Sequence, residues 1–232
     1  MVCLLSQLIS GSLSLEGAIV YILSSLVVIF LTLPVHEFAH GFAATKLGDP
    51  TPRYQGRMTL NPFAHIDYLG AACILLFGFG WAKPVGVNTR YFKNPKRDMA
   101  LTALAGPLSN LIVALAALII ANIFRLFITG FASLFIYFHL FFYYIAYINV
   151  SLAVFNLIPI PPLDGSRLLS ALLPYKQYYA LMRYERYIFW GLLALLWFGV
   201  LDIPLEFLTD KVMWLLNLAA DLPFRLITLI KG

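Results

Sequence analysis

Long apolar stretches alternate with short charged connections along this chain, which is the pattern of a polytopic membrane protein. The first stretch begins near Gly17 and runs 19 residues to Val35 without a charged side chain. At about 1.5 Å per residue, this length just crosses about 30 Å of hydrocarbon. We expect this helix to continue through HEFAHGFAATKLGD and to end near Gly48, because Pro50 and Pro52 oppose further helix.

Further apolar stretches predict further spans. Residues 99–124 and 131–158 form two of them, and residues 187–201 form a fourth. Residues 205–230 carry charged side chains among apolar ones and either span or lie in the interface as an amphipathic helix; we favour the interface. We therefore expect an all-α polytopic membrane protein with about four to five transmembrane helices. Residues 1–232 would form a single membrane-embedded domain.

Residues 69–82 are apolar but too short for a comfortable span, and their flanks carry charges. A re-entrant element fits this stretch better. Glycines in and beside it disfavour a regular helix, at positions 70, 78, 80 and 86. Irregular backbone at membrane depth is tolerated only where protein or a watery cavity covers it.

Composition and charge agree with a membrane protein. Hydrophobic residues make up 61% of the chain and charged residues 12%, which excludes disordered, collagen-like and secreted disulfide-rich classes. No Lys or Arg precedes Lys46, whereas eight of the 16 fall in residues 46–97 and four in residues 167–186. By the positive-inside rule both connections face the cytoplasm. The net charge of +5 therefore reflects topology, and we expect no nucleic-acid partner.

The N-terminal segment and the cysteines add little. Residues 1–16 lack the basic region of a cleavable signal, so we expect no removable targeting peptide. Cys3 and Cys73 have no metal-type spacing and are expected to be unpaired and structural.

The segment HEFAH, residues 36–40, is an H-E-x-x-H pattern at the cytoplasmic end of the first predicted helix. Its i, i+4 spacing puts both imidazoles on one helix face, where His36 and His40 can share one zinc ion. Glu37 then lies beside the metal, where it can take a proton from water and pass it to a leaving amine. The alternative is polar residues snorkelling to the interface, although ionisable groups inside a membrane are costly unless paired.

A catalytic zinc usually has three protein ligands and one open position, so a third ligand is required. Asp164 is the best candidate, in NLIPIPPLDG after the third predicted span and on the same cytoplasmic side as HEFAH. The prolines break the helix and leave an extended segment that can turn the carboxylate inward. Without HEFAH, a plain helix-terminating turn would be the simpler interpretation.

Together, HEFAH on one membrane helix and NLIPIPPLDG after a later one resemble the site-2 proteases, which are intramembrane zinc metalloproteases. LNPFAHID, FGFGWAKPV and AGPLSN extend the resemblance over residues 17–200. The resemblance implies one Zn²⁺ held by His36, His40 and Asp164, with Glu37 as the catalytic carboxylate, and it supports a membrane-associated sheet at residues 70–87. The chain is similar to the short branch of the family, because it has no room for the PDZ or CBS domains of other members.

Three further polar residues could face the site. Asn156 and Asn110 could each hold substrate backbone or stabilise a developing oxyanion. Interhelical hydrogen bonding is the alternative for both. His65, in LNPFAHID, could be an extra or inhibitory metal ligand, or a hydrogen-bonded turn histidine. His139 lies among aromatic residues and is expected to pack there.

These features predict a zinc-dependent intramembrane endopeptidase in a cell membrane, with its active site towards the cytoplasmic side. Its partners would be the lipid bilayer and a membrane protein substrate with a single span. The substrate would unwind beside residues 70–87, which either present a strand edge or plug the helix bundle.

Two non-catalytic alternatives use the same sequence features. A membrane zinc-binding or zinc-transport protein should carry acidic and histidine residues along several spans, and only one such cluster is present. A catalytically silent scaffold should lack an essential residue, and none is missing.

Overall fold

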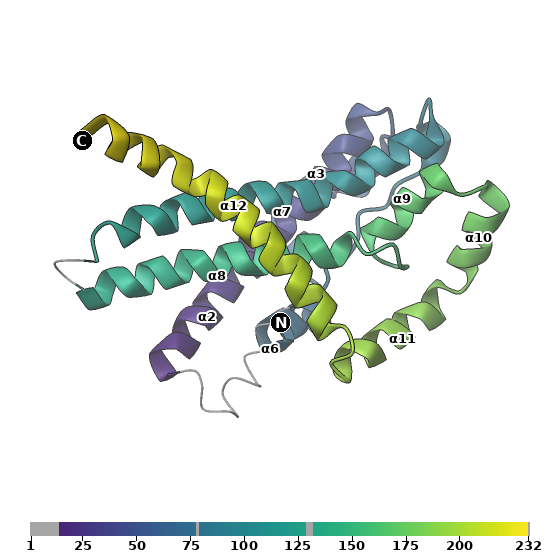
Figure 1. Ribbon diagram of the computed structural model, residues 1–232. Helices are drawn as coiled ribbons and strands as arrows, with labels where there is room; N and C mark the ends of the chain where they lie inside the picture. Colours follow the sequence, from purple (N-terminus) through teal and green to yellow (C-terminus); the bar gives the residue numbers. More distant parts are fainter. Residues whose placement is uncertain (1–13, 78, 129–131, 232) are drawn as a thin grey trace.

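The computed structural model describes residues 14–77, 79–128 and 132–231, and this part of the chain is almost entirely helical (Figure 1). It contains no β-strand, and its one isolated bridge pairs Ile66 with Ala82 in antiparallel fashion. The expectations for Cys3 and for most of residues 1–16 fall outside the described residues. Cys73 is unpaired, as expected.

The first span is a continuous helical segment whose second half carries HEFAH. It consists of α2 (Leu15–Val27), the π-helical turn η1 (Val28–Thr32) and α3 (Leu33–Lys46). The side chain of Ser14 caps its start by accepting a hydrogen bond from the Gly17 N–H. Its end at Lys46 is followed by Gly48 with φ of +108°, a conformation that favours glycine. The predicted helix boundaries are confirmed here.

Helices α7 (Pro95–Arg125) and α8 (Ala132–Asn156) form the second and third spans and lie side by side (Figure 1). Small residues of α7, including Ala114, Ala117 and Ala121, are buried and allow close helix packing. Residues 145–155 of α8 are buried throughout and form much of the core. Helix α7 also packs against α3 and α9, so it connects the parts of the chain that bear the predicted ligands.

The glycine-rich stretch differs from the expected irregular element. Residues Tyr68–Phe77 form the regular helix α6, and residues 79–87, named the extended segment below, follow it outside any helix, with Ala82 bridged to Ile66. A Cβ on Gly70 or on Gly80 would lie 2.0 Å from the carbonyl oxygen of Trp81 or of Gly70, respectively. These two glycines therefore permit close contact between the helix and the extended segment and do not break the helix. Gly78 lies outside the described residues, and the expected β element is not shown.

The C-terminal part comprises four helices, α9 (Asp164–Leu172), α10 (Tyr175–Arg183), α11 (Glu185–Trp197) and α12 (Asp202–Lys231). Helices α11 and α12 meet at 84°, close to Gly199 with φ of +69°. By length and composition the described residues hold three helices that can cross a membrane, or four if the bent pair is one span.

The last helix joins the bundle. Helix α12 crosses α7 and α8 (Figure 1) and packs against both of them. Asp221 of α12 accepts a hydrogen bond from Asn122 and pairs with Arg125, both at the end of α7. The chain is thus a multi-pass membrane protein whose segment 205–230 is tied to the spanning helices.

The connection between α3 and α7 is compact. It contains the short helices α4 (Thr51–Tyr54), α5 (Pro62–His65) and η2 (Thr89–Tyr91) besides α6. The fully buried carboxylate of Asp49 accepts hydrogen bonds from the backbone N–H groups of Thr51 and Asn88. This carboxylate holds the start and the end of the connection together.

Candidate active site

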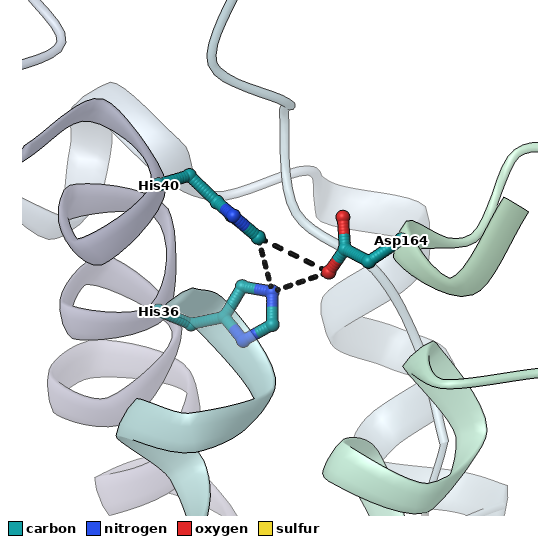
Figure 2. Close-up of side chains that lie close together, drawn as sticks. All are labelled: His36, His40 and Asp164. Atoms are coloured by element: carbon teal, nitrogen blue, oxygen red, sulfur yellow. Dashed lines mark hydrogen bonds and ion pairs between the residues drawn. The ribbon is translucent and has the colours of Figure 1, made fainter. Parts of the chain in front are cut away.

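Three side chains predicted as metal ligands converge on one point (Figure 2). The Nε2 atoms of His36 and His40 lie 3.1 Å apart. The Oδ2 atom of Asp164 lies 3.2 Å from the first and 3.1 Å from the second. The histidines come from α3 and the aspartate from the first residue of α9, so packing joins residues that are 124 positions apart in the sequence.

The opposite nitrogen of each imidazole is also engaged. The Nδ1 atom of His36 lies 3.3 Å from the Oδ1 atom of Asn110, and the Nδ1 atom of His40 lies 2.7 Å from the carbonyl oxygen of Thr102. Both partners are acceptors, so each Nδ1 carries the proton and each Nε2 directs a lone pair at the shared point. Two imidazole nitrogens and a carboxylate oxygen lie within reach of one ion, and this donor set fits zinc.

Gly106 of α7 provides the space for the two imidazoles. A Cβ at this position would lie 2.3 Å from Nε2 of His40 and 2.6 Å from Cε1 of His36. Any side chain here would displace the rings from the shared point. Sequence reasoning missed this role, although Gly106 lies in AGPLSN, one of the segments that carry the family resemblance.

Asp164 is presented by the turn between α8 and α9. The proline-rich stretch NLIPIPPLDG ends α8 as expected, but residues 157–163 form turns and bends where an extended segment was predicted. The turn folds tightly, because a Cβ on Gly165 would lie 2.3 Å from the carbonyl oxygen of Leu157. Burial alone would raise the pKa of the Asp164 carboxyl, but the adjacent imidazoles of His40 and His36 lower it well below its ordinary value. A carboxylate binds a metal ion in its ionised form, so this direction agrees with the proposed ligand role.

Glu37 is buried beside the metal group but is not part of it. Its Oε2 atom accepts a hydrogen bond of 2.9 Å from the backbone N–H of Val85, in the extended segment that follows α6. The glutamate therefore joins the HEFAH helix to the extended segment at the site.

A cavity of about 570 Å³ opens next to these residues. Its lining comes from α3, residues 79–84, the end of α8, and α9, α10 and α11. His36, Glu37 and Asp164 are among the lining residues, and much of the remaining lining is apolar. The cavity thus combines a metal-type group with space suited to an apolar ligand.

The two candidate asparagines occupy different places. Asn156, at the end of α8, lines the cavity. Asn110 is 1% exposed and lies behind His36, where it contacts the imidazole and is not among the lining residues. Its Nδ2 atom has no hydrogen-bond partner within the described part of the chain.

The other histidines lie away from the metal group. His65 is fully buried, and its Nε2 contacts the carbonyl oxygen of Thr59 at 2.9 Å. Its own carbonyl oxygen accepts a hydrogen bond from the N–H of Lys83. This geometry is that of a hydrogen-bonded turn histidine. His139 donates from Nδ1 to the carbonyl oxygen of Ala121 and stacks on Tyr143.

Comparison with known proteins gives a consistent result. The family described as "Peptidase family M50" matches residues 24–198. A Bacillus subtilis (strain 168) protein named "Putative zinc metalloprotease YwhC" is 41% identical over 162 residues, which cover 66% of this chain and 69% of that protein. The Methanocaldococcus jannaschii protein "Zinc metalloprotease MJ0392" is 28% identical over 153 residues, covering 66% of this chain and 35% of that longer protein. No solved structure gives a significant match.

Proposed function

This chain belongs to peptidase family M50, the site-2 type of zinc metalloendopeptidase, and we propose that it hydrolyses peptide bonds in or near transmembrane segments of other membrane proteins. The observation that carries the proposal is the shared cavity. Glu37 and two of the three proposed ligands, His36 and Asp164, line a largely apolar space within a bundle of membrane helices. Such a cavity suits a substrate segment that is itself apolar.

Zinc is the cofactor, and we assign one ion to His36, His40 and Asp164. Two imidazoles and a carboxylate form a donor set that zinc accepts in metalloproteases, with a further coordination position left open. When bound, zinc supplies Lewis acidity that polarises the scissile carbonyl and makes water a better nucleophile.

Glu37 is the proposed catalytic carboxylate. Located next to the ligands and outside their group, it takes a proton from the attacking water and returns a proton to the leaving amine. The Val85 N–H holds one oxygen of the carboxylate and limits its rotation while these transfers occur.

Two asparagines have proposed supporting roles. Asn156 lines the cavity, so its amide can contact the substrate backbone or the developing oxyanion. Asn110 can reach the reaction only through His36, so we assign to it the orientation of that imidazole.

The extended segment after α6 is the proposed place where the substrate backbone lies. Residues 79–82 line the cavity, and proteolysis needs an extended peptide because a helix buries its carbonyl groups in its own hydrogen bonds. The β element expected from the sequence would then form when the substrate strand pairs with this segment.

We propose that the site faces the cytoplasm of a cell membrane. His36 and His40 lie in α3, which leads into the basic connection 46–97, and Asp164 directly precedes the basic connection 167–186. Both connections are cytoplasmic by the positive-inside rule. The proposed partner is a single-span membrane protein held in the bilayer, and the chain would act as one metalloprotease domain without a nucleic-acid partner.

A zinc-transport or zinc-binding function would use the same ligands. Transport requires a series of polar sites across the membrane, whereas the described residues form a single metal-type group. The cavity beside that group favours proteolysis.

The test is incubation of the purified chain in detergent with a panel of single-span segments, with and without a zinc chelator. Cleavage that is lost on chelation and restored by zinc supports the proposal. Zinc bound with one-to-one stoichiometry but no cleavage of any segment contradicts it and supports the zinc-binding alternative.

A further inference from the structure

The cavity has a basic wall that the proposed chemistry does not use. Arg167 of α9, Arg183 of α10 and Arg186 of α11 line it, and Glu185 is the only acidic residue among the lining residues outside the metal group and Glu37. Arg183 and Arg186 are exposed, and neither forms an ion pair within the described part of the chain. Arg167, Arg183, Glu185 and Arg186 together give this part of the lining a net positive charge.

The basic wall adjoins an apolar one. Along α11, Arg186 in the first turn is followed by Phe189, Leu192 and Leu193, which also line the cavity. The ring of Phe189 packs edge-on against Trp81 of the extended segment, with ring centroids 5.4 Å apart. At 1.5 Å per residue, Phe189 lies about 4.5 Å and Leu193 about 10 Å along the helix from Arg186. A substrate segment whose apolar part is followed directly by polar flanking residues would match this change in the lining.

We propose that Arg183 and Arg186, supported by Arg167, form a specificity subsite for an acidic side chain on the cytoplasmic flank of the substrate segment. The inference rests on the proposed function and names the substrate class. A guanidinium binds a carboxylate through two parallel hydrogen bonds, so this wall discriminates by charge and by geometry.

The subsite would disfavour the binding of most transmembrane segments. Cytoplasmic flanks of transmembrane helices are generally rich in Lys and Arg, and such a flank is repelled by a wall of the same sign. A segment with Asp or Glu in this place is attracted. The basic wall thus selects a minority of spans, whereas the apolar cavity alone would accept almost any of them.

Anionic lipid headgroups are a competing ligand for exposed arginines near a membrane surface. The position of the residues favours the peptide, because these arginines line the same cavity as Glu37 and Asp164. A carboxylate that binds these arginines is therefore expected to come from the substrate peptide in the cavity and not from a lipid headgroup.

The experiment uses the full zinc-loaded chain and three single-span peptides that differ only in a cytoplasmic flank of Asp, Gln or Lys residues. The readout is the ratio of kcat/KM values. We expect the acidic flank to be cleaved about fivefold to tenfold faster than the neutral one, and the basic flank slower by a similar factor. In the double variant Arg183→Glu, Arg186→Glu the order should reverse, with zinc content as a measure of intact folding.

The matched control is Arg90→Glu, Arg97→Glu, which changes the same charge at two exposed arginines that do not line the cavity. It should keep the wild-type order. Equal cleavage of all three flanks, or an unchanged order in the Arg183, Arg186 variant, overturns the subsite while leaving the protease assignment intact. Cleavage that depends on anionic lipid in vesicles but not on the flank also overturns it. Failure to cleave any peptide contradicts the proposed function itself.

Discussion

The two halves of the metal group are built in different ways. His36 and His40 come from one helix, where i, i+4 spacing alone places them on one face. Asp164 reaches them through tertiary packing, from the first residue of a helix that begins after a tight turn. Helix α7 contacts both halves. The local half therefore needs only an intact α3, whereas the distant half depends on how α7, α8 and α9 fit together.

The largest expected effect separates two roles within the local half. Glu37→Gln should lower kcat by about 10³-fold or more, because the proposed proton carrier is lost. Zinc content should be unchanged, because Glu37 lies outside the metal group. Metal analysis and peptide cleavage on the same sample measure both. Glu16→Gln, an acidic residue at the far end of the same span, is the control, and wild-type activity in Glu37→Gln would remove Glu37 from the mechanism.

The distant half can be removed by Asp164→Ala. Zinc affinity should fall by more than about 100-fold, since changes to residues that merely orient ligands already cost 10- to 100-fold. Helix content should stay the same because α3 and its histidines do not depend on this carboxylate. Competition with a zinc chelator measures the affinity, and Asp202→Asn serves as the control. Tight one-to-one zinc in Asp164→Ala would show that another residue is the third ligand.

This difference also explains what could be predicted from the sequence. The HEFAH helix, its end near Gly48 and the two histidines on one face follow from local rules, and these predictions agree with the structure. Asp164 could be proposed only from topology and family resemblance, and the structure brings it to the histidines. Long-range packing has no such local signal, so the contact of Asn110 with His36 was not predicted.

The glycines also show that sequence alone does not reveal long-range contacts. The stretch that begins at Gly70 was expected to avoid regular helix, yet residues 68–77 form α6. A glycine in the sequence signals either a flexible backbone or a close approach, and only the structure shows which neighbour comes near. Gly70 and Gly106 both serve close approach, one to a backbone and one to the imidazoles.

Gly106→Ala tests whether the close approach of α7 fixes the positions of the His36 and His40 imidazoles. Its Cβ would overlap both imidazoles, so we expect zinc affinity to fall by about 10- to 100-fold, in line with overpacking costs of about 1–3 kcal/mol. Gly191→Ala is the matched control, since a Cβ on this helical glycine meets nothing within 4 Å. Chelator competition compares the two variants, and equal affinities would show that the imidazoles can shift without loss.

Asn110→Ala should have a smaller effect on the same half. Without the acceptor for its Nδ1 proton, His36 keeps its place on α3 but loses its fixed orientation, and zinc affinity should fall by about tenfold. Asn122→Ala, another buried asparagine of α7 that bonds to Asp221, is the control. Unchanged affinity in Asn110→Ala would indicate that packing alone orients the ring.

The smallest effect concerns the link between the local half and the extended segment. Val85→Pro removes the backbone N–H that holds Oε2 of Glu37, and Val85 lies outside helices and strands, where a proline interrupts no helical or ladder hydrogen bond. Loss of one hydrogen bond to a charged group corresponds to about tenfold in kcat. Zinc content should not change, because the metal group does not include Val85. Val85→Ala keeps the N–H and should retain wild-type kcat. If both variants lose activity equally, the side chain of Val85 and its packing matter, and the backbone hydrogen bond to Glu37 does not contribute to catalysis.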